Sequence, residues 1–208
     1  MQSAPTPSVS RKEENNFHRV NRLLLKYGKE VLRNLFDAKC PPDKLKDILS
    51  EDKNSQTLTK LYDDGHLTTH QKRKLYPDDP SIVSSANFDI TLLAMLLRNI
   101  CGFSKPEDNK WKRPRDNSTE ANIARLRIYK NKITSHSVNP SLTDAAFETY
   151  WRNITKVIIA LGGEERYASL ISQLKTEPLD SGAEILSQGL PEKKQELEDL
   201  KGTLIPIR

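Results

Sequence analysis

Three side chains with complementary chemistry lie close together near the end of a basic stretch: Lys130, Asn131 and His136. An ammonium group neutralises phosphate charge, an amide forms hydrogen bonds, and an imidazole transfers protons near neutral pH. Together they are suited to handling a phosphodiester. The alternative is structural, because the stem of Lys130 can pack along a helix, and a protonated His136 is favoured beside a helix C-terminus.

The helix that must position these side chains, called the motif helix below, is expected from Asn117, a good N-cap residue, to about Thr134. The lysine and the asparagine then fall near its end and the histidine just beyond it. A run of Lys and Arg can also be an ordinary solvated helix face. Three more cations of this helix are candidate contacts to RNA phosphates: Arg125, Arg127 and Lys132.

Apolar residues at helical spacing along the rest of the chain indicate an all-α fold. A long amphipathic helix is predicted from Phe17 to the Pro41-Pro42 pair, and the most apolar helix from Phe88 to Cys101. We therefore predict an up-and-down helical bundle with a helical excursion between its first two core helices. The other predicted helices lie at 42–50, twice within 57–75, and at 143–161 and 164–174.

Two further positions bear on a site. Asp89 opens the most apolar helix, where the helix dipole favours a carboxylate. It either caps that helix or supports the site by orienting a basic side chain of the motif helix. His66 and His70 have the i, i+4 spacing of a zinc pair, but no acidic residue follows His66 and no cysteine lies near. We expect neither a metal nor a cofactor.

Composition limits the class of protein. The chain has 208 residues, of which 36% are hydrophobic, and a net charge of +5, which permits an anionic partner without demanding one. No apolar run approaches the ~20 residues that span a bilayer, so we expect no membrane partner. Two cysteines and no secretory signal fit a cytoplasmic protein, with the nucleus as the alternative. We expect a disordered arm at 1–15, a helical domain at 16–176, and a polar tail with a weak helix at 177–208.

Four segments, taken in order, resemble the HEPN superfamily, and more narrowly the HEPN branch of the DAZ-interacting RING-finger ubiquitin ligase. They are residues 16–28 (NFHRVNRLLLKYG), residues 88–102 (FDITLLAMLLRNICG), the Lys130-Asn131…His136 element, and Phe147 with Tyr150-Trp151. The resemblance implies a helical bundle, and in HEPN nucleases it implies metal-independent RNA cleavage across a dimer. In that motif an arginine contacts the phosphate and a histidine transfers the proton. Here the histidine is His136, the polar residue is Asn131, and Lys130 stands at the arginine position.

These observations leave three functions open. The first is an interaction module that binds RNA or forms a homodimer in innate-immune or ubiquitin-linked signalling, with signalling or ubiquitin-pathway proteins as partners. The second is a metal-independent endoribonuclease acting across a homodimer, weakened because lysine lacks the planar, two-pronged geometry of arginine. The third is a purely structural helical scaffold, because a fold does not specify a function.

Overall fold

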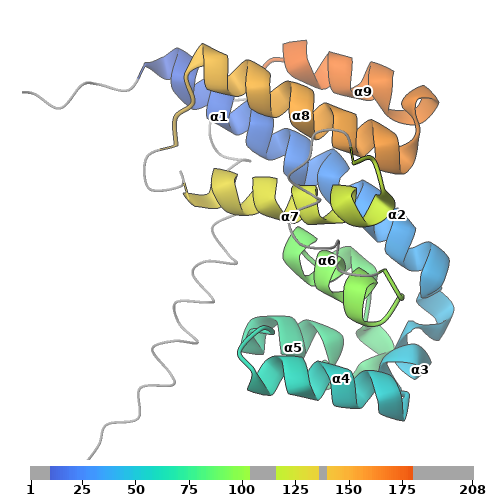
Figure 1. Cartoon of the computed structure of the whole chain (residues 1–208). Helices are drawn as coiled ribbons and strands as arrows, with labels where there is room; N and C mark the ends of the chain where they lie inside the picture. Colours follow the sequence, from blue (N-terminus) through green and yellow to red (C-terminus); the bar gives the residue numbers. More distant parts are fainter. Residues whose placement is uncertain (1–9, 104–115, 136–139, 180–208) are drawn as a thin grey trace, which may run out of the picture.

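The computed structural model describes residues 10–103, 116–135 and 140–179, and within these ranges the regular structure is helical (Figure 1). The all-α fold predicted from the periodicity is therefore confirmed. Several sequence predictions lie outside the described residues: the arm at 1–9, the tail from 180 onward with its weak helix, and His136.

The first long helix runs through three consecutive segments: α1 (Arg11–Leu23), a π-helical segment (Leu24–Gly28) and α2 (Lys29–Lys39). It begins at Arg11 rather than near Phe17, because Ser10 and Glu13 form a capping box. Residues 11–15, expected in a disordered arm, are therefore helical. The helix ends at Cys40, whose backbone leaves the helical region at φ −126° and ψ 81°, since the residue before a proline disfavours the helical conformation.

The predicted excursion consists of short helices between α2 and the central helix. A 3-10 turn (Pro42–Lys44) leads into α3 (Leu45–Ser50), which is followed by α4 (Asp52–Asp63) and α5 (Thr69–Leu75). Two more 3-10 turns, Pro80–Ile82 and Ser85–Asn87, return the chain to the bundle. In Figure 1 the α4–α5 pair lies at the lower end of the molecule, beyond α6 from α7.

The bundle proper contains α1 and α2 together with four later helices: α6 (Ile90–Asn99), α7 (Thr119–Ser135), α8 (Asp144–Gly162) and α9 (Glu164–Thr176). As predicted, α6 is the most buried helix, since all residues from Leu92 to Leu97 are buried. Helix α7, the motif helix, packs against α6 on one side and against α8 and α1 on the other, and α9 covers α8 (Figure 1). The motif helix is thus held by three neighbours.

Two local details concern the start of α7 and the packing at the end of α8. The N-cap of α7 is Ser118 rather than Asn117: its Oγ accepts a hydrogen bond from the Ala121 N–H at 3.2 Å. Helix α8 is closely packed at its last residue, Gly162, where a Cβ would overlap the ring of Tyr167 and approach Val31 Cγ1 at 2.9 Å. Glycine is therefore needed there for close packing of α9 on α2.

Candidate cationic site on the motif helix

The motif helix is anchored by its apolar residues and by its aromatic ring. Ile123, Leu126 and Ile133 are buried in the core. The ring of Tyr129 packs edge-to-face on Tyr150 of α8, with centroids 6.2 Å apart. Burial in this contact raises the pKa of Tyr129, so the hydroxyl is neutral at physiological pH. The helix therefore presents its polar side chains from a fixed support.

The helical repeat decides which candidates share a surface. Arg127, Lys130 and Asn131 are spaced i, i+3 and i+4, so they lie on one side of α7. Lys130 is half-buried and Asn131 is exposed, which matches a lysine whose stem packs while its amine reaches solvent. Lys132 is exposed on a different side of the helix. His136 lies outside the described residues, so the structure brings together only part of the predicted motif.

Charge on this helix is largely uncompensated within the described part of the chain. There, Arg127, Lys130 and Lys132 take part in no ion pair. Arg125 differs, because its guanidinium donates a hydrogen bond to Asn122 Oδ1 at 2.8 Å and so helps to hold its own helix. The accessible cations suit contact with an anionic partner.

A further arginine, on α6, adds to this charge. Burial lowers the pKa of Arg98, and the nearby positive charge of Arg127 lowers it further. The sequence analysis did not select Arg98 as a site residue. One feature of the sequence indicated a special role for Arg98, which is that this cation ends the apolar run of α6.

Asp89 performs the capping role. One carboxylate oxygen accepts a hydrogen bond from the Leu92 N–H at 2.7 Å, and the other lies 3.5 Å from Gln71 Nε2 of α5. No hydrogen bond or ion pair joins it to the described residues of the motif helix. Its supporting role in the site stays a prediction, and its structural role is to start α6 and hold α5 beside it.

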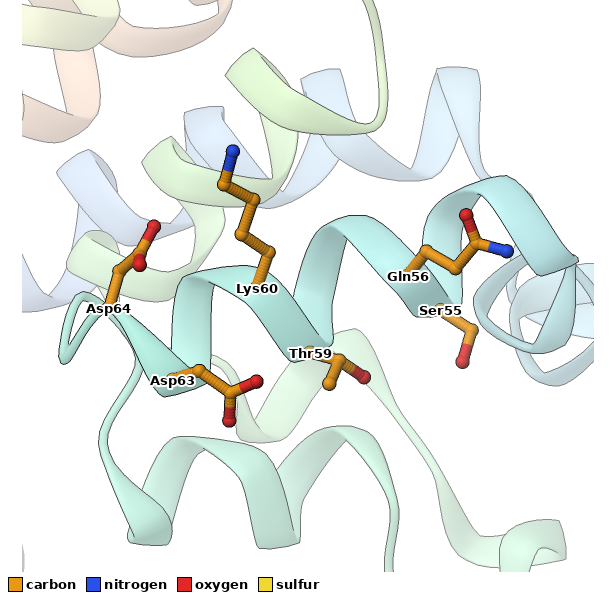
Figure 2. Close-up of a pocket in the computed structure, with 6 residues that line it drawn as sticks. All are labelled: Ser55, Gln56, Thr59, Lys60, Asp63 and Asp64. Atoms are coloured by element: carbon orange, nitrogen blue, oxygen red, sulfur yellow. The ribbon is translucent and has the colours of Figure 1, made fainter.

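A shallow depression of about 470 Å³ lies on α4, away from the motif helix (Figure 2). Its lining comes from this one helix and the residue after it: Ser55, Gln56, Thr59, Lys60, Asp63 and Asp64. In Figure 2 Lys60 and Asp63 point to opposite sides of α4, so these groups do not converge on a ligand. This depression therefore contributes nothing to the candidate site.

The described residues give little indication of a metal or a membrane segment. No group of three or more His, Cys, Asp or Glu side chains within them is placed to hold a metal ion. Of the two histidines with the spacing of a zinc pair, His66 is exposed and His70 is half-buried. None of the described helices has the length and apolar character needed to cross a membrane.

Comparison with known proteins agrees with the helical arrangement and with the resemblance. The sequence model of the DZIP3/hRUL138-like HEPN family matches residues 42–185, which is most of the chain. The chain therefore belongs to this family of HEPN domains.

Two relatives carry the name of a ubiquitin ligase. The E3 ubiquitin-protein ligase DZIP3 of Homo sapiens is 27% identical over 174 residues, which cover 80% of this chain and 14% of the relative. The protein of the same name from Mus musculus is 26% identical over 174 residues, with the same coverage. The chain thus spans about a seventh of the length of these relatives, and no solved structure matches it.

Proposed function

We propose that this chain is a HEPN interaction module that binds RNA, forms a homodimer, or does both, in ubiquitin-linked or innate-immune signalling in the cytoplasm or nucleus. The main support is the cationic side of α7, where the half-buried Lys130 stands at the position of the motif arginine. An ammonium group still attracts a phosphate, but it makes a point contact instead of the two parallel hydrogen bonds of a guanidinium. Such a site favours binding over efficient cleavage.

The relatives support the pathway part of the proposal. Both are E3 ubiquitin-protein ligases of which this chain matches about 14%, so the HEPN unit is one part of a much larger protein there. By analogy, this unit would recruit RNA or a partner to signalling or ubiquitin-pathway proteins. The homodimer would form through the exposed parts of α6 and α7, with two motif helices facing each other.

Binding to a labelled single-stranded oligoribonucleotide tests the RNA branch. We expect Lys130→Ala and Lys132→Ala to weaken binding, because each removes a phosphate contact. Lys156→Ala, which removes an exposed lysine of α8, is the matched control and should bind as the wild type does. Equal affinity in all four proteins would reject the motif helix as the RNA surface.

Sedimentation of the purified chain tests the dimer branch. A concentration-dependent dimer that is weakened by a bulky change at Asn131, such as Asn131→Trp, would support an interface on this side of α7. A monomer at all concentrations would remove this branch. The RNA and dimer branches are therefore decided separately.

A metal-independent endoribonuclease remains the second candidate, because Lys130 and Asn131 lie on one side of α7, and Asn131 precedes His136 by five residues in the sequence. Cleavage that persists in EDTA, disappears in His136→Ala and rises in Lys130→Arg would establish it. Absence of cleavage in the wild type and in Lys130→Arg would reject it and leave the binding module.

A further inference from the structure

The last turn of α6 places a partly buried arginine beside the motif helix. The Nε atom of Arg98 is buried and has no hydrogen-bond acceptor. The charge of Arg127 on α7 is near enough to disfavour the charged form of Arg98. Two like charges at a helix–helix interface repel each other, and a buried donor without an acceptor costs free energy. An anion between them would remove both penalties.

No carboxylate in the described part of the chain supplies that negative charge. Neither arginine forms an ion pair or a hydrogen bond with another described residue. This differs from other cations at helix contacts, such as Arg166, whose guanidinium binds Glu30 Oε1 at 2.7 Å. The fold therefore pairs some of its basic side chains internally and leaves these two without a counter-charge.

The position of Arg127 connects this pair to the motif. Arg127 lies one helical turn before Lys130 and on the same side of α7. A guanidinium has a planar fork of donors that matches two oxygens of a phosphate, which an ammonium group cannot reproduce. Arg98 and Arg127 each carry the planar fork of donors that Lys130 lacks.

We propose that Arg98 of α6 and Arg127 of α7 form a binding site for a phosphate group of an RNA backbone, adjacent to Lys130. The identity of the ligand rests on the RNA binding proposed above. The site itself rests on the pairing of two guanidinium groups without a counter-charge. The site and the identity of its ligand can be tested separately, because a small phosphate compound can bind the site whether or not the protein binds RNA.

Inorganic pyrophosphate is the first probe, with the thermal midpoint of unfolding as the readout. We expect pyrophosphate to raise the midpoint of the wild type, and to have little effect on Arg98→Gln or Arg127→Gln. Arg152→Gln removes one positive charge from an exposed position of α8 and is the matched control, which should keep the wild-type response. An equal response in all four proteins would overturn the proposal.

Stability without ligand gives a second, independent readout. If the arginines repel each other, Arg127→Gln should be at least as stable as the wild type in the absence of phosphate. Arg98→Lys keeps the charge but loses the Nε donor and the fork, so it should bind pyrophosphate roughly ten- to a hundredfold more weakly. Loss of stability in Arg127→Gln together with wild-type pyrophosphate binding would mean a purely structural role and would overturn the site.

The oligoribonucleotide then separates the two proposals. RNA binding that is unchanged in Arg98→Gln and Arg127→Gln, but lost in Lys130→Ala, would overturn this site and leave the RNA module standing. A pyrophosphate response that depends on both arginines, without RNA binding by the wild type, would keep the site and reject RNA as its ligand.

A different observation carries a second inference, which concerns the two cysteines. Cys40 follows α2 and Cys101 follows α6, and their Sγ atoms lie 3.5 Å apart although the residues are 61 positions apart in sequence. The hydrogen bond from the Cys101 thiol lowers the pKa of Cys40, which favours the reactive thiolate. We infer that this pair is a reversible disulfide site that joins the ends of α2 and α6. Hydrogen peroxide is the required oxidant: one Sγ–Sγ bond forms, the O–O bond breaks, and each of the two thiol protons joins one of the resulting hydroxyl groups, so that two water molecules leave.

Non-reducing mass spectrometry after treatment with hydrogen peroxide tests this site. We expect a mass loss of two hydrogens, no remaining alkylatable thiol, and reversal by a dithiol reductant. Cys40→Ser should give neither the mass loss nor the higher thermal midpoint expected from closing this loop. Two free thiols after treatment, or added oxygen instead of lost hydrogen, would overturn it.

Discussion

At the scale of single residues, the proposed phosphate contact of the motif helix depends on the lysine at position 130. Its amine is a point charge, and its stem is half-buried along α7. Arginine would reach the same place with a fork of donors and could make a second hydrogen bond to the same phosphate. The functional consequence therefore depends on one side-chain geometry rather than on net charge.

Lys130→Arg should strengthen RNA binding by roughly fivefold, since one added hydrogen bond contributes about 1 kcal/mol. Titration of a labelled oligoribonucleotide measures this change. Lys132→Arg is the control: it makes the same substitution on another side of the helix and should change affinity little. A similar gain in both variants would show that the motif position has no special geometry.

Tyr167 gives a prediction about alkaline pH. Its ring is fully buried, and its hydroxyl donates a hydrogen bond to Glu30 Oε1 at 2.9 Å. Burial, and then the carboxylate of Glu30, raise the pKa of Tyr167 from its usual value of 10 to about 12. The folded state then holds the proton more tightly than the unfolded state, so the free energy of unfolding should fall as pH rises from 10 to 12. Chemical denaturation across this range should show a smaller fall in Tyr167→Phe than in the wild type.

At the scale of elements, the start of α6 depends on Asp89. The sequence allowed two roles for this residue: capping its own helix or supporting the site on the motif helix. Asp89→Ala should lower the free energy of unfolding by about 1 kcal/mol, and Asp89→Asn by much less, because asparagine caps as well as aspartate. Thermal unfolding measures both. RNA affinity should follow the wild type in Asp89→Asn if capping is the whole role. A selective loss of affinity there would show that the carboxylate also supports the site.

The junction of α8 and α9 contains two glycines that are needed for different reasons: Gly162 ends α8 and Gly163 connects it to α9. At Gly162 an added side chain meets Tyr167 and Val31, whereas Gly163 has open space but a backbone φ of +89°. Gly162→Ala should cost about 1–3 kcal/mol through overpacking, and Gly162→Ser should cost more. Gly163→Ala should also cost about 1–3 kcal/mol, through backbone strain, and Gly163→Ser about the same. Equal Ala and Ser costs at position 162 would contradict the packing explanation.

At the scale of the whole molecule, the modest net charge of +5 matters less than its distribution over the surface. If α7 and the end of α6 hold the RNA backbone, the logarithm of affinity should fall linearly with the logarithm of salt concentration. The slope for single strands is about 0.7 per phosphate neutralised, so removal of one contacting cation should lower it by about that amount. Affinity that does not change with salt would reject backbone binding.

Much of the architecture could be predicted because helices have local causes. Apolar spacing identified the long first helix, the apolar α6 and the later helices, and Pro41-Pro42 marked where α2 must stop. The boundaries were less certain where capping decided them. Ser10 extended α1 to Arg11, and Ser118 rather than Asn117 began α7, because the choice among neighbouring polar residues depends on side-chain contacts.

The sequence by itself determined the all-α class, the membership of the HEPN family and the lysine at the motif position. These depend on residue types and short spacings, which a linear chain displays directly. The tertiary structure alone decided that Arg98 of α6 lies near enough to Arg127 of α7 to feel its charge, and that Cys40 meets Cys101. Such pairs join residues far apart in sequence, and their proximity depends on how α2, α6 and α7 pack, which no local pattern records.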